Sequence, residues 1–347
     1  SGLHITLDGG NTWRQLTSED GLPKGDLGRI GVAFAPLDPS VVYALVEAEK
    51  NGLYRSDDGG FSWSVVNKDT DVSPRPFYYA DIRVDPADPD RVYRLGSVVS
   101  VSNDGGKSFG TLMPWSLVHP DHHALWIHPD DPHWIVNGND GGVAISKNHG
   151  ETWRFVTNLP LAQFYHVAVD DAVPFNVYGG LQDNGSWRGP NTVWENGGIR
   201  NHHWQELCFG DGFATMPVPG QTEVGYAMSQ GGSLVRWNAT TGERRSIRPT
   251  DPIEEDAPEL RFNWNAGIAV DPFEPDTVYY GSQYLHRSRD RGDTWETISP
   301  DLTTNNPEWQ RQSESGGLTI DDTEAENYTT ILTIAPSALQ QGLIWVG

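Results

Sequence analysis

The segment Ser56-Asp57-Asp58-Gly59-Gly60-Phe61-Ser62-Trp63 decides the fold, because versions of it recur along the chain. The shared pattern is Ser/Thr-x-Asp-x-Gly-x-Thr/Ser followed by an aromatic residue. It occurs at residues 6–13, 56–63, 102–109, 146–153 (with Asn at the Asp position) and 288–295. The aromatic ends of the first four copies lie 50, 46 and 44 residues apart. Repeats of this length are typical of β-propeller blades.

A second element precedes each copy: a short apolar run, a Pro/Asp turn and another apolar run. Proline presets φ in such turns and Asp bonds to its own backbone, so these segments are predicted to be β-hairpins. Seven occur, at residues 30–43, 80–93, 124–136, 166–178, 213–226, 267–279 and 331–346. With degraded copies of the recurring segment at 178–187 and 226–237, the sequence predicts an all-β, seven-bladed β-propeller of four-stranded antiparallel blades.

The two ends of the chain complement each other. Residues 331–347 supply the first two strands of a blade, the inner hairpin, without the last two, the outer pair. Residues 1–16 supply an outer pair without an inner hairpin. We therefore expect these ends to complete one blade and close a single propeller domain over residues 1–347. The chain starts in strand-like sequence, which indicates a trimmed or fragmentary chain.

The recurring segment is expected on the turn between the two outer strands of a blade. Its hydroxyl and its carboxylate can accept backbone N–H bonds and so tie the hairpin together. Its glycines permit positive φ, and its Trp is expected to pack between neighbouring blades. The alternative is that these Asp residues are catalytic or bind calcium. Architecture is favoured, because one role repeated around a ring is usually structural.

The charge balance narrows the classes of partner. Lys and Arg number 24 against 47 Asp and Glu, which gives a formal net charge of −23. This field repels nucleic acid and anionic membrane surfaces, and it suits cations or neutral ligands such as sugars. No apolar stretch reaches the ~18 residues of a membrane span. Cys208 is the only cysteine, so no intrachain disulfide can form.

The repeats resemble those of sialidases, sortilin-type receptors and two-propeller xyloglucanases. The closest resemblance is to bacterial neuraminidase-repeat (Asp-box) proteins of the sortilin-like "glycosyl hydrolase" group, and stretches 28–31, 138–142, 162–165, 180–184 and 298–302 carry it. The resemblance implies an extracellular or periplasmic protein, and a second propeller in a longer chain or a partner chain. Sialidases carry Arg-Ile-Pro, whereas Arg29 and Ile30 are followed here by Gly31, so sialidase activity is disfavoured.

Functional groups are expected on one face of the propeller, because the loops before the first strand of each blade and between its second and third strands share one end. Loops on a rigid scaffold often carry binding sites. The candidate catalytic residues are Asp121, Asp140, Asp183 and Asp211. The candidate ligand-binding residues are His122, His123, Asn139, Gln163, Tyr165, Gln182, Asn184, Trp204, Asn263 and Trp264.

These candidates have structural alternatives. Asp140 and Asp183 lie in Gly/Asn turns, where Asp often caps the turn, and tryptophans pack more often than they stack on sugars. The pairs 122–123 and 202–203 are histidines, but adjacent histidines in a strand or loop point apart, so no metal site is assigned. No cofactor is expected. Acidic loops could hold Ca²⁺, although no EF-hand sequence is present.

Three functions are compatible with the sequence. The first is a propeller that binds a polysaccharide or a protein partner at this face. The second is a glycoside hydrolase, which would need two carboxyl groups about 5–10 Å apart, one of them with a raised pKa. The third is a structural or assembly module. The sequence does not decide whether the chain is an enzyme.

Overall fold

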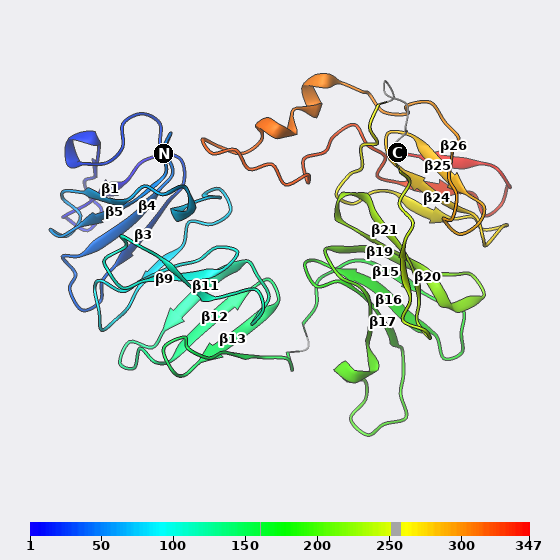
Figure 1. Cartoon of the computed structure of the whole chain (residues 1–347), viewed down its shortest axis with the longest axis horizontal. Coiled ribbons are helices and arrows are strands. Elements are labelled where there is room, and N and C mark those ends of the chain that lie inside the picture. Colours follow the sequence, from blue (N-terminus) through cyan, green and yellow to red (C-terminus); the bar gives the residue numbers. More distant parts are fainter. Residues whose placement is uncertain (160, 251–257) are drawn as a thin grey trace. The chain divides into compact units, whose positions relative to one another are not determined.

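A computed structural model describes residues 1–159, 161–250 and 258–347. The described chain is built of β-strands and short 3-10 helices (Figure 1). None of its helices is long and apolar enough to cross a membrane. The 3-10 helices are η1 (Ser18–Asp20), η2 (Thr70–Val72), η3 (Asn201–His203), η4 (Gln230–Gly232), η5 (Pro307–Gln310) and η6 (Gln312–Glu314).

The described strands form six four-stranded and two two-stranded antiparallel sheets, each with its strands in chain order. The chain divides into two compact units, Ser1–Leu159 with Ser313–Asp321, and Pro160–Gln312 with Asp322–Gly347. The first unit holds β1 (His4–Ile5), β2 (Arg14–Gln15), β3 (Ile30–Phe34), β4 (Val42–Val46), β5 (Gly52–Ser56), β6 (Ser64–Asn67), β7 (Ile82–Val84), β8 (Val92–Arg94), β9 (Val99–Ser102), β10 (Gly110–Met113), β11 (His122–Ile127), β12 (Ile135–Asn139), β13 (Gly142–Ser146) and β14 (Arg154–Phe155).

The second unit holds the remaining strands in the same antiparallel pattern. They are β15 (Phe164–Val169), β16 (Asn176–Leu181), β17 (Ser186–Pro190), β18 (Gln205–Cys208), β19 (Gly212–Val218), β20 (Gln221–Ser229), β21 (Ser233–Asn238), β22 (Arg244–Ser246), β23 (Ile268–Val270), β24 (Val278–Gly281), β25 (Leu285–Ser288), β26 (Glu296–Thr297), β27 (Ile334–Pro336) and β28 (Ile344–Val346).

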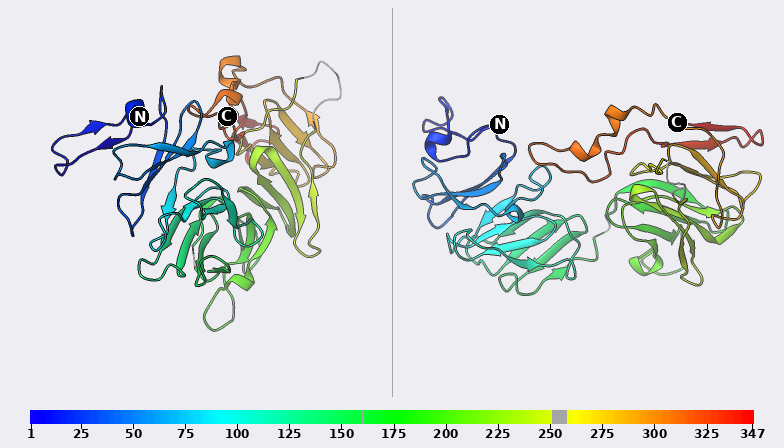
Figure 2. Two further views of the ribbon diagram at one scale, coloured as in Figure 1. Left: turned by 60° about the vertical axis from the view of Figure 1, so that its left-hand side comes forward. Right: turned by 45° about the horizontal axis from the view of Figure 1, so that its top comes forward.

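All seven predicted hairpins are present as antiparallel strand pairs. They are β3–β4, β7–β8, β11–β12, β15–β16, β19–β20, β23–β24 and β27–β28. The sheets β1–β2 (dark blue in Figure 2) and β27–β28 have two strands each, which matches the outer and inner pairs expected at the chain ends. The all-β, antiparallel prediction is thus confirmed, whereas seven blades in a closed ring stay a prediction.

Four of the five clear copies of the recurring segment form the turn between the third and fourth strands of a sheet, as expected, and the copy at 6–13 forms the β1–β2 turn. The degraded copies predicted at 178–187 and 226–237 are wrong, because these residues form the connections between the second and third strands of their sheets, β16–β17 and β20–β21. In the β5–β6 turn, the Asp58 carboxylate accepts the Ser62 backbone N–H at 2.9 Å and the Ser62 hydroxyl at 2.6 Å. The Ser56 hydroxyl oxygen accepts the Gly60 N–H at 2.9 Å. The same hydrogen bonds occur around Asp104 and Asp290.

A further backbone hydrogen bond joins this turn to the inner turn of the same sheet. The N–H of Gly59 donates to the Ser40 carbonyl at 2.7 Å, and that of Arg291 donates to the Asp276 carbonyl at 3.0 Å. The residues at this position have positive φ, 78° at Gly59 and 60° at Arg291. Equivalent bonds run from Gly105 to Asp90 and from His149 to His133. The two turns at this end are therefore fixed to each other in these four sheets.

The tryptophans of the recurring segment differ in burial. Trp63 is 7 % exposed and packs in an apolar cluster with Leu16, whereas Trp13 is 61 % exposed. The Trp295 indole N–H donates to the Ile247 carbonyl at 2.7 Å, just after β22. Trp295 thereby joins its sheet to the preceding one, which is the inter-sheet packing the sequence predicts for this position.

Removing the Asp290 carboxylate is expected to destabilise the fold. The Asp290→Ala variant loses hydrogen bonds from Ser288 and Thr294, so we expect the free energy of unfolding in urea to fall by about 1–2 kcal/mol. Asp290→Asn should retain most of the wild-type stability, because Asn148 occupies the equivalent position in another copy of the segment and accepts the Thr152 N–H at 3.0 Å. Equal loss in both variants would contradict this role of the turn.

The same carboxylate should make stability depend on pH in acid. Hydrogen bonds from Thr294 and Ser288 lower the pKa of Asp290 from 3.8 to about 2. Its stabilising contribution is therefore present above pH 3.8 and lost as the pH falls towards 2. As the pH falls from 3.8 towards 2, we expect the free energy of unfolding of the wild type to decrease relative to that of Asp290→Asn. Urea unfolding at several pH values measures this difference. A pH-independent difference would contradict it.

Candidate functional site

Two tyrosines and two candidate aspartates meet at one end of the first unit. The Tyr79 hydroxyl donates a hydrogen bond to the Asp121 carboxylate, and the Tyr78 hydroxyl donates to Asp140 Oδ2 at 3.4 Å. The Asp140 backbone N–H donates to the Asp121 carbonyl at 3.2 Å. Asp121 precedes β11 and Asp140 lies in the β12–β13 turn, so these loops share one end of the sheet.

His123, the second residue of β11, completes this group. Its Nε2 lies 3.5 Å from Asp140 Oδ1. Its ring stacks on Tyr79, with the ring centroids 5.4 Å apart, and meets Tyr78 edge to face at 4.9 Å. His122 has the opposite orientation: it is 1 % exposed and its Nδ1 lies 2.8 Å from the amide oxygen of Asn137. Strand alternation thus places His123 in the cluster and His122 in the core.

A positive charge lies against the same tyrosines. The Arg75 guanidinium lies 4.9 Å from the ring centroid of Tyr78 and 5.8 Å from that of Tyr79. Arg75 also pairs with Asp321, at 2.7 Å between Nε and Oδ1. Residues 313–321 belong to this unit, and the Thr319 N–H donates to the buried Glu47 carboxylate at 3.0 Å. We call Arg75, Tyr78, Tyr79, Asp121, His123 and Asp140 the tyrosine–aspartate cluster.

The environment of Asp140 disfavours its charge. Burial raises the pKa of Asp140, the nearby Asp121 carboxylate raises it further, and His123 acts in the opposite direction. Asp121 has φ of 64°, a conformation that Asp adopts more readily than most residues. Two neighbouring carboxyl groups in different environments can divide the roles of acid and base.

The sequence reasoning missed Arg75, Tyr78 and Tyr79. They lie in the loop before β7, which occupies the same place in its sheet as the loop before β11 that was singled out. If the loop before the first strand of every sheet had been treated as a candidate binding loop, this tyrosine pair would have been found from the sequence. The Asp321 partner of Arg75 is 246 residues away and carries no local signal.

In the second unit, Asp211 connects neighbouring loops through hydrogen bonds. Its Oδ1 accepts the Asp183 backbone N–H at 2.7 Å and its Oδ2 accepts the Trp264 indole N–H at 2.8 Å. Its own backbone N–H donates to the Gln230 side chain at 2.8 Å. Asp211 is 9 % exposed, and both carboxylate oxygens are engaged, so the carboxylate acts as a structural acceptor in this conformation.

The neighbouring candidates form a polar surface around it. The Tyr165 ring lies 4.4 Å from that of Phe213, and burial, with the charges of Asp211 and Asp183, raises the pKa of Tyr165 to about 12. The Gln163 side chain donates to that of Gln182 at 2.7 Å. A hydroxyl that stays protonated beside carboxylates can donate a hydrogen bond to a ligand.

The remaining candidates make local contacts. The side-chain amide of Asn184 donates to the Gln182 carbonyl at 2.9 Å, and that of Asn263 donates to the Asn327 carbonyl at 3.0 Å. The Asn139 side chain accepts the Gly141 N–H at 3.0 Å and so caps the β12–β13 turn, a role that the sequence analysis considered for Asp140 instead. The half-buried Trp204 covers Gly189, where an added Cβ would come within 2.5 Å of the indole ring.

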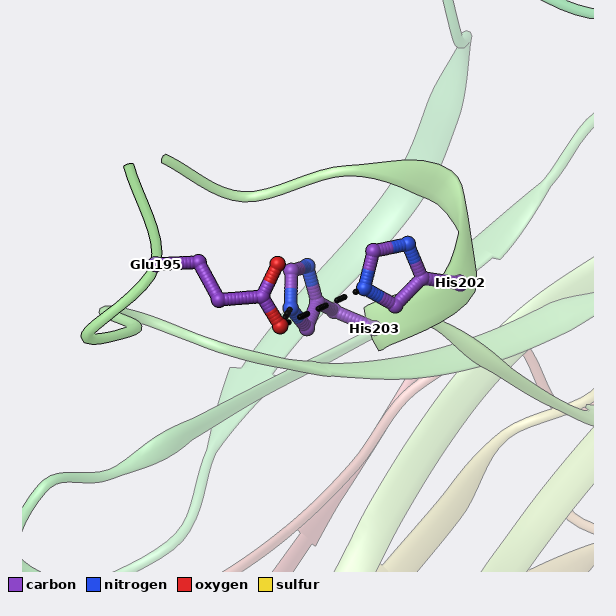
Figure 3. A group of neighbouring side chains, drawn as sticks. All are labelled: Glu195, His202 and His203. Atoms are coloured by element: carbon purple, nitrogen blue, oxygen red, sulfur yellow. Dashed lines mark hydrogen bonds and ion pairs between the residues drawn. The ribbon is translucent and has the colours of Figure 1, made fainter. Parts of the chain in front are cut away.

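A third group lies in residues 191–204, the long connection between β17 and β18 (Figure 2, left). Here Glu195 Oε1 lies 3.1 Å from His203 Nε2 and 3.5 Å from His202 Nε2 (Figure 3). The two histidine rings have their centroids 3.9 Å apart. The expectation that these adjacent histidines point apart is wrong, because both lie in the tight turn of η3 and face one carboxylate.

No family model matches the chain. A xyloglucanase from a Paenibacillus species is 25 % identical over 332 residues, covering 75 % of this chain and 31 % of that protein. The chain therefore spans about a third of the length of this relative.

Two solved structures have weaker similarity. A xyloglucanase of family GH74 from Xanthomonas campestris is 18 % identical with a TM-score of 0.33, over 91 % of this chain and 50 % of that one. YCF48 from Cyanidioschyzon merolae is 16 % identical with a TM-score of 0.29, over 77 % and 84 % of the chains. Similarity at this level assigns neither fold nor function.

The charge of Asp140 in the tyrosine–aspartate cluster should reduce the stability of the fold at neutral pH. Since the pKa of Asp140 is raised in the folded state, ionisation of this carboxyl favours unfolding as the pH rises above 3.8. Asp140→Asn is therefore expected to raise the thermal unfolding midpoint slightly at pH 7 and to have no effect below pH 3.8. A lower midpoint at pH 7 would show that the charge of Asp140 supports the fold.

Proposed function

We propose that the chain binds a glycan at the tyrosine–aspartate cluster. The observation that carries this proposal is the meeting of Tyr78, Tyr79 and His123 with the Asp121 and Asp140 carboxyl groups on loops at one end of the first unit. Aromatic faces pack against the apolar faces of sugar rings, and carboxylates accept their hydroxyl protons.

Charge and similarity support a neutral carbohydrate as the ligand. The net charge of −23 disfavours anionic partners. The curated relative is a xyloglucanase, so soluble xyloglucan oligosaccharides are the first ligands to test. A glycan ligand also suits the extracellular or periplasmic location expected from the sequence, which forms part of the proposal.

Glycoside hydrolysis is the second candidate function, and the environment of Asp140 favours it. Burial and the Asp121 charge raise the pKa of Asp140, which suits a general acid that protonates a leaving oxygen. Asp121, held by the Tyr79 hydroxyl, would be the second carboxyl group of the pair. Tyr79, only 6 % exposed, would position Asp121 and leave the contact with sugar to Tyr78.

The test of binding is calorimetric titration of the purified chain with xyloglucan oligosaccharides. We expect Tyr78→Ala to weaken binding by about tenfold or more, because one stacked aromatic ring contributes on the order of 1–2 kcal/mol. The matched control is Tyr328→Ala, which removes a 63 % exposed tyrosine of the second unit. Unchanged binding in Tyr78→Ala would contradict this location.

Hydrolysis is tested in the same samples by release of reducing sugar. For a hydrolase, Asp140→Asn and Asp121→Asn should each abolish release while oligosaccharide still binds. Binding without release by the wild type would leave recognition as the function. Loss of release only in Asp183→Asn or Asp211→Asn would move the site to the second unit.

We further propose that residues 1–16 and 331–347 complete one blade of a seven-bladed ring. A shared blade in the usual strand order would make β28 the neighbour of β1. In a Cys208→Ser background, Ile5→Cys with Trp345→Cys should then form a disulfide, because adjacent strands lie within the about 7 Å that a disulfide spans. Arg14→Cys on β2 with Trp345→Cys should not. Cross-linking in the control pair alone would contradict the strand order.

A further inference from the structure

We propose that Glu195, His202 and His203 form a binding site for Zn²⁺ on the connection between β17 and β18. Their ligand atoms all lie within 4.8 Å of one another. The Glu195 oxygen lies 3.1 and 3.5 Å from the two Nε2 atoms. Ligand atoms of a tetrahedral zinc ion, bonded at about 2.0–2.2 Å, lie about 3.4 Å apart. The spacing around Glu195 thus fits zinc without a large movement of the chain.

The fold of the connection brings these residues together. His202 and His203 are consecutive in η3, which directly precedes the C-cap Trp204, and Glu195 faces them from the other side of the loop (Figure 3). Trp204 covers Gly189 in β17, which anchors this end of the loop to the sheet. One carboxylate and two imidazoles are ligands that suit zinc and other late first-row metals more than Ca²⁺ or Mg²⁺.

Metal binding replaces the hydrogen bonds between the two histidines and Glu195, and it removes the one that the Arg200 backbone donates to His203. His203 Nδ1 accepts the Arg200 backbone N–H at 2.9 Å, so the neutral ring carries its proton on Nε2 and donates it to Glu195. Coordination of zinc through Nε2 moves that proton to Nδ1. Nδ1 can then no longer accept a hydrogen bond, so the Arg200 N–H must donate to water instead. Arg200 is exposed, so water can replace the lost bond. The ring proton is kept, and no co-reactant is needed.

Zinc would cross-link the two sides of residues 191–204. The segment includes Trp194, which is fully exposed and adjoins Glu195. A bound ion would hold this indole in a defined position on the surface. The consequence is local, since the connection leaves and re-enters one sheet through β17 and β18.

Limited proteolysis tests the site directly, because Arg200 is the only Lys or Arg in residues 191–204. Trypsin should cut the metal-free chain after Arg200 and give fragments of residues 1–200 and 201–347. We expect ZnCl₂ to slow this cut by about tenfold, since binding stabilises the uncut conformation. MgCl₂ at the same concentration should not slow it.

Variants separate a zinc site from other effects of the salt. His202→Ala and Glu195→Gln should each remove the protection and lower the zinc affinity measured by calorimetry about tenfold or more. His133→Ala, which removes an exposed histidine paired with Asp131 in the first unit, should keep both. His202 is 59 % exposed, so its variant should melt like the wild type. Protection that survives in His202→Ala, or protection by MgCl₂, would overturn the proposal.

Discussion

One backbone hydrogen bond fixes the scaffold on which the other features depend. In four sheets, the residue after the Asp or Asn of the recurring segment turns its N–H towards the inner turn of the same sheet. The bond needs positive φ, which glycine supplies at Gly59 and Gly105. His149 and Arg291 adopt the same conformation without that freedom, at φ of 62° and 60°. The hydrogen bond is therefore kept even where a residue other than glycine must adopt the less favourable positive φ.

This constraint separates the two ends of each sheet. In a four-stranded antiparallel meander, the first and third turns lie at one end, and both are engaged by the hydrogen bond. The second turn and the loop before the first strand lie at the other end. Tyr78, Tyr79, Asp121 and Asp140 all come from this other end. The proposed binding site therefore lies at the end of its sheet opposite the recurring turns.

The same residue type has opposite electrostatic behaviour at the two ends. At Asp290, hydrogen bonds from a hydroxyl and a backbone N–H favour the charged form and lower the pKa. At Asp140, burial and a neighbouring carboxyl group favour the neutral form and raise it. The first environment stabilises the folded chain at neutral pH, and the second destabilises it. A destabilising carboxyl group in a cluster of aromatic side chains is typical of a functional site rather than of a turn.

The sequence by itself determined the strands, the hairpins and the turns, because each depends on residues within about ten positions of one another. The five clear copies of the Asp-containing segment located their outer turns, and apolar runs separated by Pro-containing turns located all seven inner hairpins. Only the tertiary structure decided which side chains meet. Arg75 reaches Asp321, and η3 directs two adjacent histidines at Glu195. These contacts depend on the path of individual loops, which follows no periodic pattern, so they leave no repeated signal in the sequence.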